Sequence, residues 1–265
     1  MNLVQKRKQR SRVENGNKLN QTYEVTNVCL LAGKIMLQSG AETYRVEDTM
    51  MRIAASIGIH QSHSFVTPTG IIFSIDGTDP TKFVRISDRT TDLQKVTIVN
   101  SISRKISSGE MSLKDAYEEM KQIETANLAY PVLIQITAAS LVGGCFTMMF
   151  QGGWHDFIPG LVSGGVGFSC FIYFHRLVQV KFFAEFLASF IIGLLSFLFV
   201  TIGFGNELDK IIIGSVMPLV PGLLITNAVR DLMAGHLVSG LSKGAEAFLT
   251  AFAIGTGIAV VLSLF

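Results

Sequence analysis

The sequence has few cysteines and lacks the motifs of several common protein classes. Its three cysteines show no CxxC spacing, so neither a disulfide framework nor a zinc site is expected. Gly235 and Gly240 stand at P-loop spacing, but Leu241 follows where a phosphate-binding lysine is required. The net charge of +2 provides no clustered basic face for nucleic acid. We therefore expect no cofactor, no ATP-driven pumping and no nucleic-acid partner.

Charge is scarce in the second half of the chain. Residues 1–130 hold 17 of the 22 Lys and Arg and 14 of the 20 Asp and Glu. The remaining residues contain five apolar runs, each long enough to cross a hydrocarbon core of about 30 Å. These runs are 131–150, 157–174, 182–204, 211–228 and 245–265. The sequence therefore predicts an α-helical polytopic membrane protein with five transmembrane helices in a membrane domain, 127–265.

The part before this membrane domain is polar. Residues 1–20 form a basic tail that we expect to be disordered, and no apolar stretch follows it to make a cleavable signal peptide. Residues 21–126 alternate helical and strand patterns, which predicts a cytosolic α+β domain. Lys and Arg in the short loops between the apolar runs are concentrated on one side, which predicts a cytosolic N-terminus and an external C-terminus in the plasma membrane.

Within residues 21–126, spacings of three and four predict helices over 22–38 and 92–108, the second with Leu93 inward. Ser39 and Glu42 resemble a capping box that opens a helix over about 41–57, with Tyr44 and Met51 inward. Ser112 and Asp115 cap a last helix that runs to about Ile123. Residues 62–76 read as two short strands interrupted at 68–70, and 81–86 as a third, in a small antiparallel sheet.

The outer face of the 41–57 helix is dense in charge and allows two interpretations. Its residues include Glu42, Arg45 and Glu47. They form either solvated ion pairs worth a few tenths of a kcal/mol each or a gating or substrate-contacting surface. His60 and His63, with Ser39 or Ser64 and Asp76, contain the residue types of a hydrolase. No GxSxG motif supports that reading, and we interpret them as ordinary histidines.

The run 211–228 carries Pro218 and Pro221, with Gly222 directly after. A proline inside a helix removes a backbone donor and costs about 3 kcal/mol or more. Broken backbone at membrane depth is tolerated where it is packed in protein or lines a cavity, and broken helices form substrate sites in transporters. We therefore predict a solute pathway at this segment and the polar residues that follow it, namely Thr226, Asn227, Arg230, Asp231 and Ser239.

Helical spacing places Arg230 one turn after Thr226, and Asp231 one turn after Asn227, so two polar stripes would face one cavity. An arginine binds a carboxylate with two parallel hydrogen bonds, which predicts a small carboxylate substrate. Glu185, Glu246 and His236 are candidates for proton coupling because they lie in or near the apolar runs. Alternatively, these three side chains reach water at the helix ends.

Three strings resemble the threonine/serine exporter family. They are LAGKIMLQSGAETYRVEDTMMRI (31–53), FVTPTGIIFS (65–74) and MPLVPGLLITNAVRDLMAGHLVSG (217–240). The resemblance implies a cytosolic N-terminal domain followed by membrane helices. It also implies export of threonine, serine or dicarboxylates such as succinate. Some members of this family are split, and the resemblance then implies a smaller four-helix membrane subunit as partner, in a homo- or hetero-oligomer.

The residues and the resemblance together predict a transporter subunit in contact with membrane lipid, and no enzyme activity. The alternative is a membrane-anchored cytosolic enzyme or sensor, in which the helices only tether residues 21–126. That alternative predicts that Pro218 and Pro221 tolerate replacement.

Overall fold

A computed structural model describes residues 22–76, 81–178 and 182–264, so the predicted tail 1–20 lies outside the described residues. The chain is mostly helical, with one small sheet, and divides into two compact units. The first unit contains the chain up to Ala129 together with Asn227–Ser242, and the second contains Tyr130–Thr226 and Lys243–Phe265. The sequence did not predict that Asn227–Ser242 packs with the first unit.

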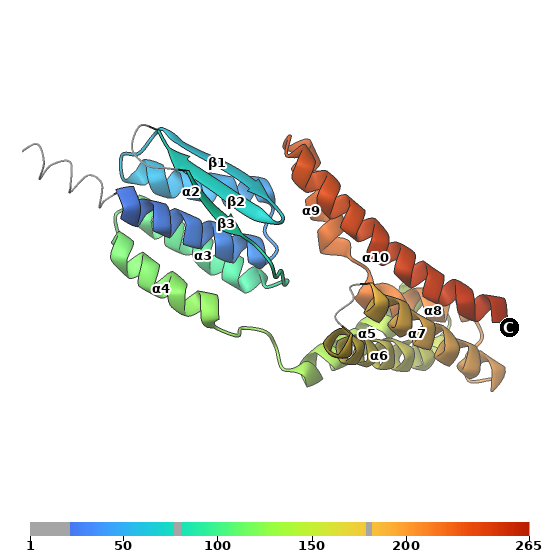
Figure 1. The fold of residues 1–265 in the computed structure, drawn as a ribbon. Coiled ribbons are helices and arrows are strands. Elements are labelled where there is room, and N and C mark those ends of the chain that lie inside the picture. The colour runs from blue at the N-terminus through green and yellow to red at the C-terminus, as the bar shows by residue number, and fades with distance from the viewer. Residues whose placement is uncertain (1–21, 77–80, 179–181, 265) are drawn as a thin grey trace, which may run out of the picture. The chain divides into compact units, whose positions relative to one another are not determined.

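Strands and helices of the first unit follow the predicted pattern closely. A helix over residues 22–38 is followed by α2 (Thr43–Ser56), and then by β1 (Ser62–Thr67), β2 (Gly70–Ile75) and β3 (Lys82–Arg85). The chain continues into α3 (Leu93–Ser107) and α4 (Leu113–Thr125). The sheet is antiparallel in the order β1-β2-β3, and it lies on one side of the unit with α4 on the other (Figure 1).

Two local sequence features explain the turn between β1 and β2 and the start of α4. Pro68 and Thr69 form the tight turn between β1 and β2, where proline presets the backbone angle of a turn. The Ser112 side chain accepts a hydrogen bond from the Asp115 N–H and caps α4, as predicted. One core of buried aliphatic side chains, with Phe73 and Met50 at its centre, joins the sheet to the helices.

The predicted capping box at Ser39 is wrong. Glu42, not Ser39, is the N-cap of α2, and its side chain makes no capping hydrogen bond. Ser39 and Gly40 instead end the preceding helix: Gly40 has a φ of +88°, and the Ala41 N–H bonds to the Met36 carbonyl. This is a Schellman motif, which needs glycine in the left-handed conformation.

Three side chains predicted to point inward are substantially exposed. Tyr44, Met51 and Leu93 are 36%, 41% and 49% exposed. Because α2 begins at Thr43, its buried face is set by Val46, Met50 and Ile53, and Tyr44 and Met51 fall outside that face. Leu93 is the first residue of α3 and precedes the turn that enters the core.

The second unit is built from apolar helices. It contains α5 (Val132–Met149), α6 (Trp154–Leu177), α7 (Phe183–Thr201), α8 (Leu208–Val216) and a 3-10 turn, η1 (Met217–Leu219). It also contains the start of α9 (Gly222–Met233) and most of α10 (Leu237–Leu264). Among the described residues, α5, α6, α7 and α10 are long and apolar enough to cross a membrane.

The predicted span 211–228 is broken at its prolines. Helix α8 ends at Val216, η1 contains Pro218, and α9 starts only after Pro221, inclined by 64° to the preceding segment. If this bent pair is a single span, the described part of the chain holds five candidate spans instead of four. The last predicted span, 245–265, is also longer than expected, because α10 begins at Leu237.

Glycines bring α5 and α6 into backbone contact. A Cβ atom on Gly143 would lie 2.6 Å from the carbonyl oxygen of Gly160 and 3.2 Å from the Cα of Gly164. Close approach of this kind is the usual way in which membrane helices associate, because lipid provides no hydrophobic drive between them.

We expect Gly143→Val to destabilise the protein, since the added methyl groups meet backbone that cannot rotate away. Overpacking of a core costs roughly 1–3 kcal/mol. The thermal midpoint of the full chain in detergent, followed by the fluorescence of Trp154, should fall by several degrees. Gly255→Val is the matched control, because a Cβ atom at that helical glycine meets nothing within 4 Å. Equal midpoints for the two variants would contradict the close packing of α5 and α6.

Candidate functional site

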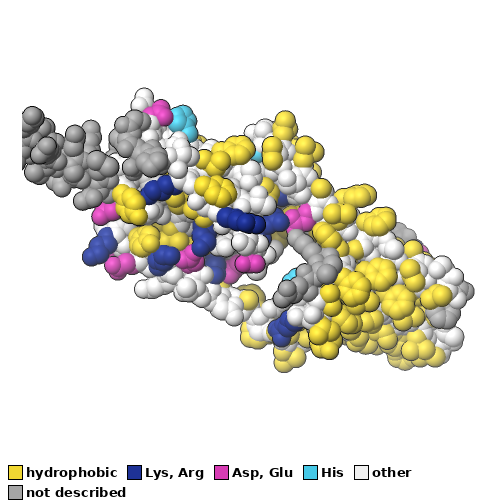
Figure 2. Space-filling model, in the orientation of Figure 1, with side chains coloured by type: hydrophobic (Ala, Val, Ile, Leu, Met, Phe, Trp, Pro, Cys, Tyr) yellow, Lys and Arg dark blue, Asp and Glu magenta, His cyan; other side chains and the backbone are white. Residues whose placement is uncertain are grey.

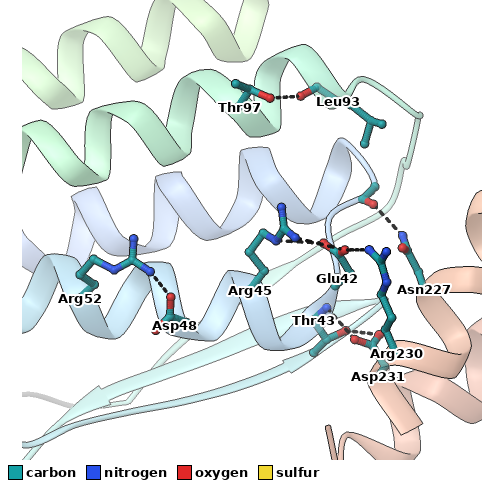
Figure 3. Close-up of polar contacts among 11 residues, drawn as sticks. Glu42, Thr43, Arg45, Asp48, Arg52, Leu93, Thr97, Asn227, Arg230 and Asp231 are labelled. Carbon is teal, nitrogen blue, oxygen red and sulfur yellow. Dashed lines mark hydrogen bonds and ion pairs between the residues drawn. The ribbon is translucent and has the colours of Figure 1, made fainter. Parts of the chain in front are cut away.

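A group of polar side chains joins α9 to the start of α2 within the first unit. We call it the α2–α9 cluster; it consists of Gly40, Glu42, Thr43 and Arg45 on one side and Asn227, Arg230 and Asp231 on the other (Figure 3). The two sides are separated by almost 190 positions in the sequence, yet they contact each other through direct hydrogen bonds. The cluster therefore fixes the segment after the proline break to the N-terminal part of the chain.

Glu42 lies between two arginines. Its Oε1 atom is 2.5 Å from Arg230 Nη1, and its Oε2 atom is 3.1 Å from Arg45 Nε. The Glu42 side chain is 8% exposed, whereas that of Arg230 is 52% exposed. Arg230 thus binds a carboxylate in this structure, and half of its surface remains accessible to solvent.

Asp231 caps α2 from a distant part of the chain. Its Oδ1 atom accepts a hydrogen bond from the Thr43 N–H at 2.9 Å, and its Oδ2 atom accepts one from the Thr43 hydroxyl at 2.9 Å. The first N–H groups of a helix have no partner within the helix and carry partial positive charge. A fully buried carboxylate at this place satisfies both needs. Asn227 adds a bond from its Nδ2 atom to the Gly40 carbonyl at 2.9 Å.

A second set of contacts holds the end of β1. The Val66 N–H donates to Glu47 Oε1 at 2.9 Å, and the Val66 carbonyl accepts a bond from Ser239 Oγ at 3.1 Å. His236 Nδ1 lies 3.8 Å from Glu47 Oε1. Burial raises the pKa of the Glu47 carboxyl, and the Val66 N–H and His236 oppose that rise only in part.

The predicted pathway residues are thus divided between two places. Asn227, Arg230, Asp231 and Ser239 meet groups of the first unit, while Thr226 is exposed and its hydroxyl donates to the Gly222 carbonyl. At the break, the carbonyls of Gly214 and Met217 accept hydrogen bonds from residues three positions on, Met217 and Val220. The prolines therefore make a bend whose nearby carbonyls already have partners.

The proton-coupling candidates are also separated. His236 adjoins Glu47 in the first unit, whereas Glu185 (in α7) and Glu246 (in α10) belong to the second. Glu185 is 8% exposed, and its Oε2 atom has no hydrogen-bond partner among the described residues. A buried carboxylate within an apolar helix is costly and is a candidate for function.

The residues of the imagined hydrolase do not assemble. His63 Nε2 lies 3.5 Å from Asp76 Oδ2 in an exposed pair, while Ser39 is buried in the turn before α2. Among the described residues, no three His, Cys, Asp or Glu side chains are grouped as metal ligands. Sequence reasoning missed Gly40, which contributes its backbone carbonyl, and Thr43, which contributes its backbone N–H and its hydroxyl. No sequence motif marks either residue.

Comparison with known proteins shows that the chain is similar to membrane transporters of one family. A model of the threonine/serine exporter (ThrE) family matches residues 27–265. A Klebsiella aerogenes protein named "Probable succinate transporter subunit YjjP" is 28% identical over 250 residues, which cover 91% of this chain and 93% of that protein. The Escherichia coli K12 protein of the same name is 28% identical over 254 residues, covering 92% and 96%.

A longer relative comes from Mycobacterium tuberculosis and is named "Probable threonine/serine exporter". It is 24% identical over 260 residues, which cover 96% of this chain and 48% of that protein. These relatives are named as transporters or exporters and not as enzymes. No solved structure matches the chain.

The raised pKa of Glu47 predicts how stability depends on pH. A carboxyl group whose pKa rises on folding stabilises the fold in its neutral form. Its contribution is therefore complete below the unfolded-state pKa and is lost as the pH rises through the folded-state pKa. We expect the thermal midpoint of the wild type to fall relative to that of Glu47→Gln as the pH rises from 4.5, the ordinary glutamate value.

The measurement is a pair of thermal melts at each pH in detergent. Asp48→Asn is the control for net charge, because it removes one carboxylate from the exposed side of the same helix. A midpoint difference between wild type and Glu47→Gln that stays constant with pH would contradict the effect of burial on Glu47.

Proposed function

This chain belongs to the threonine/serine exporter family, and on that premise we propose that it is a subunit of a secondary transporter that exports small carboxylate-bearing metabolites across the plasma membrane. The family and the apolar helices make it a multi-pass membrane protein and a transporter. The observation that carries the substrate class is Arg230, a half-exposed guanidinium that already holds a carboxylate.

The proposed substrates are amino acids such as threonine and serine, or dicarboxylates such as succinate. Each has a carboxylate that can take the place of Glu42 on Arg230. Hydrogen bonds to charged groups are worth roughly 1.5–3 kcal/mol, so the exchange of one carboxylate for another is nearly balanced. Glu42 keeps Arg45 as its partner when Arg230 is taken, which avoids leaving a buried charge unpaired.

Substrate binding at Arg230 would loosen α9 from α2, and the bend at Pro218, Pro221 and Gly222 is the place where such a movement can occur. Arg230 lies on the helix that starts at this bend. Thr226, between the bend and the cluster, is exposed and belongs to the proposed pathway, together with Asn227, Asp231 and Ser239. Broken helices with rigid pieces on both sides are the usual moving parts of secondary transporters.

The proposed transporter also has a defined orientation in the membrane, proton-coupling residues and a partner subunit. We propose five spans, as the five apolar runs predict, and the distribution of Lys and Arg in the short loops supports a cytosolic N-terminal α+β domain and an external C-terminus. Glu185, Glu246 and His236 are the proposed proton-coupling residues, and the unpartnered Glu185 Oε2 atom supports the first of them. The similar YjjP proteins are named as subunits, which supports a partner for this chain, here a smaller four-helix membrane protein in a common oligomer.

Arg230→Ala should impair efflux because the substrate loses its cationic partner. We expect the half-saturating substrate concentration to rise about 10-fold or more, as the loss of one charge-assisted bond implies. Glu42→Gln should act in the opposite direction and lower that concentration, because the internal competitor for Arg230 is weakened. Both are measured as efflux of labelled threonine or succinate from preloaded cells in which the variant replaces the native chain, so that any partner is retained.

The matched control is Arg52→Ala, which removes an arginine of α2 that pairs with Asp48 on the exposed face. This variant should transport as the wild type does. If Arg230→Ala and Arg52→Ala gave the same efflux curves, Arg230 would have no part in substrate binding.

The bend itself generates a separate prediction. Replacing both prolines, Pro218→Ala with Pro221→Ala, restores two backbone donors and allows α8 to continue into α9. We expect maximal efflux to fall while the amount of protein in the membrane stays the same. Pro159→Ala is the control, because Pro159 lies inside α6 without breaking it. Undiminished efflux in the double variant would show that transport does not need the bend.

A further inference from the structure

The segment Asn227–Ser242 has its polar and apolar sides reversed relative to an ordinary surface element. Asn227, Asp231 and Ser239 are buried against the first unit. The side chains that point away from the unit are almost all large and apolar. These exposed residues, which we call the outer face, are Val229, Leu232, Met233, Leu237, Val238 and Leu241.

The outer face itself contains no charged residue. Between Gly222 and Ser242 the charged residues are Arg230 and Asp231, and both contact the start of α2. Met233 at the end of α9 is 83% exposed. An exposed apolar patch of six large side chains, with the neighbouring polar groups turned inward, marks an interaction surface.

Helix α10 connects this surface to a candidate membrane span without interruption. Leu237, Leu241, Phe248 and Phe252 follow one another at spacings of four or seven, so they line one side of the helix, and all are exposed. Hydrophobic side chains lie along α10 in the space-filling view (Figure 2). The apolar side that lipid covers in the span thus continues to the first turn of the helix.

The length of α10 places its first turn near the membrane surface. The 28 residues of α10 extend about 42 Å at 1.5 Å per residue, and a hydrocarbon core of about 30 Å takes about 20 of them. The first two turns then lie at the level of the lipid headgroups.

We propose that α9 from Asn227 onward and the first two turns of α10 form an amphipathic hairpin that lies in the membrane interface, with the outer face in lipid and the opposite face holding α2. The segment from α8 to the first turn of α9 then remains to cross the hydrocarbon core. Helices of this kind bury their apolar side about 5–10 Å into the boundary between headgroups and acyl chains. Arg230, on the flank of α9, reaches the headgroup level with its charge paired to Glu42. The occupant of the outer face is lipid, not a second copy or another protein.

The test reads the surroundings of single spin labels in the full chain. Cys29, Cys145 and Cys170 are first replaced by alanine, and a nitroxide is attached to Met233→Cys or Leu237→Cys in vesicles of phosphatidylcholine and phosphatidylglycerol. Oxygen, which concentrates in lipid, and a nickel chelate, which stays in water, are the two collision reagents. Phe252→Cys reports the interior of the span, and Glu118→Cys, on the exposed side of α4, reports water.

Both hairpin labels should collide with oxygen several-fold more often than with the nickel chelate, and lie shallower than the label at 252. Collision rates like those at 118 would show that water covers the outer face. Low rates with both reagents would show that protein covers it. Either result would overturn the proposal. The inference rests on the membrane assignment alone, so a failed efflux experiment with Arg230→Ala would leave it intact.

Discussion

The start of α2 depends on a carboxylate that lies 188 positions away in the chain. A helix needs partners for its first N–H groups, and the sequence before α2 does not supply them: Ser39 belongs to the preceding turn, and Glu42 turns its side chain to two arginines. Asp231 fills this role instead. The helix that follows the proline break therefore helps to stabilise the start of α2, so the stabilities of the two segments depend on each other.

The same dependence explains why the α2–α9 cluster is built from charged groups. Asp231 at the positive end of α2 is a favourable contact, but a second buried carboxylate nearby, Glu42, would repel it without compensation. Arg230 and Arg45 provide that compensation, one on each oxygen of Glu42. Removing a single partner from such a group leaves a buried charge behind, which costs more than the lost bond alone. The complete cluster is therefore stable, but a ligand that displaces Glu42 from one of its arginines would destabilise it.

Local features of the fold could be predicted from the sequence, and distant pairings could not. The break at Pro218 and Pro221 follows from the geometry of a single residue type, and the hairpin at Pro68 follows from turn chemistry. The helix end predicted at residue 38 is confirmed, but Ser39 with Glu42 also fits the start of a helix, and that capping box is wrong. Only the φ of Gly40 decides between a helix end and a helix start. The contact of Glu42 with Arg230 could not be predicted in this way, because residue spacing identifies only the residues that share a face of one helix or strand.

The position of Glu42 also sets the affinity that the proposed transporter can have. A ligand shifts an equilibrium only by its difference in affinity for the two states. Arg230 can bind substrate only in molecules in which it is not paired with Glu42. These molecules are a fraction of the population, and the apparent affinity for substrate is the intrinsic affinity multiplied by that fraction. An internal pair favoured by about 1.4 kcal/mol makes binding roughly tenfold weaker. An exporter with such a competitor responds only when its substrate accumulates, which fits removal of an excess metabolite better than uptake of a scarce one.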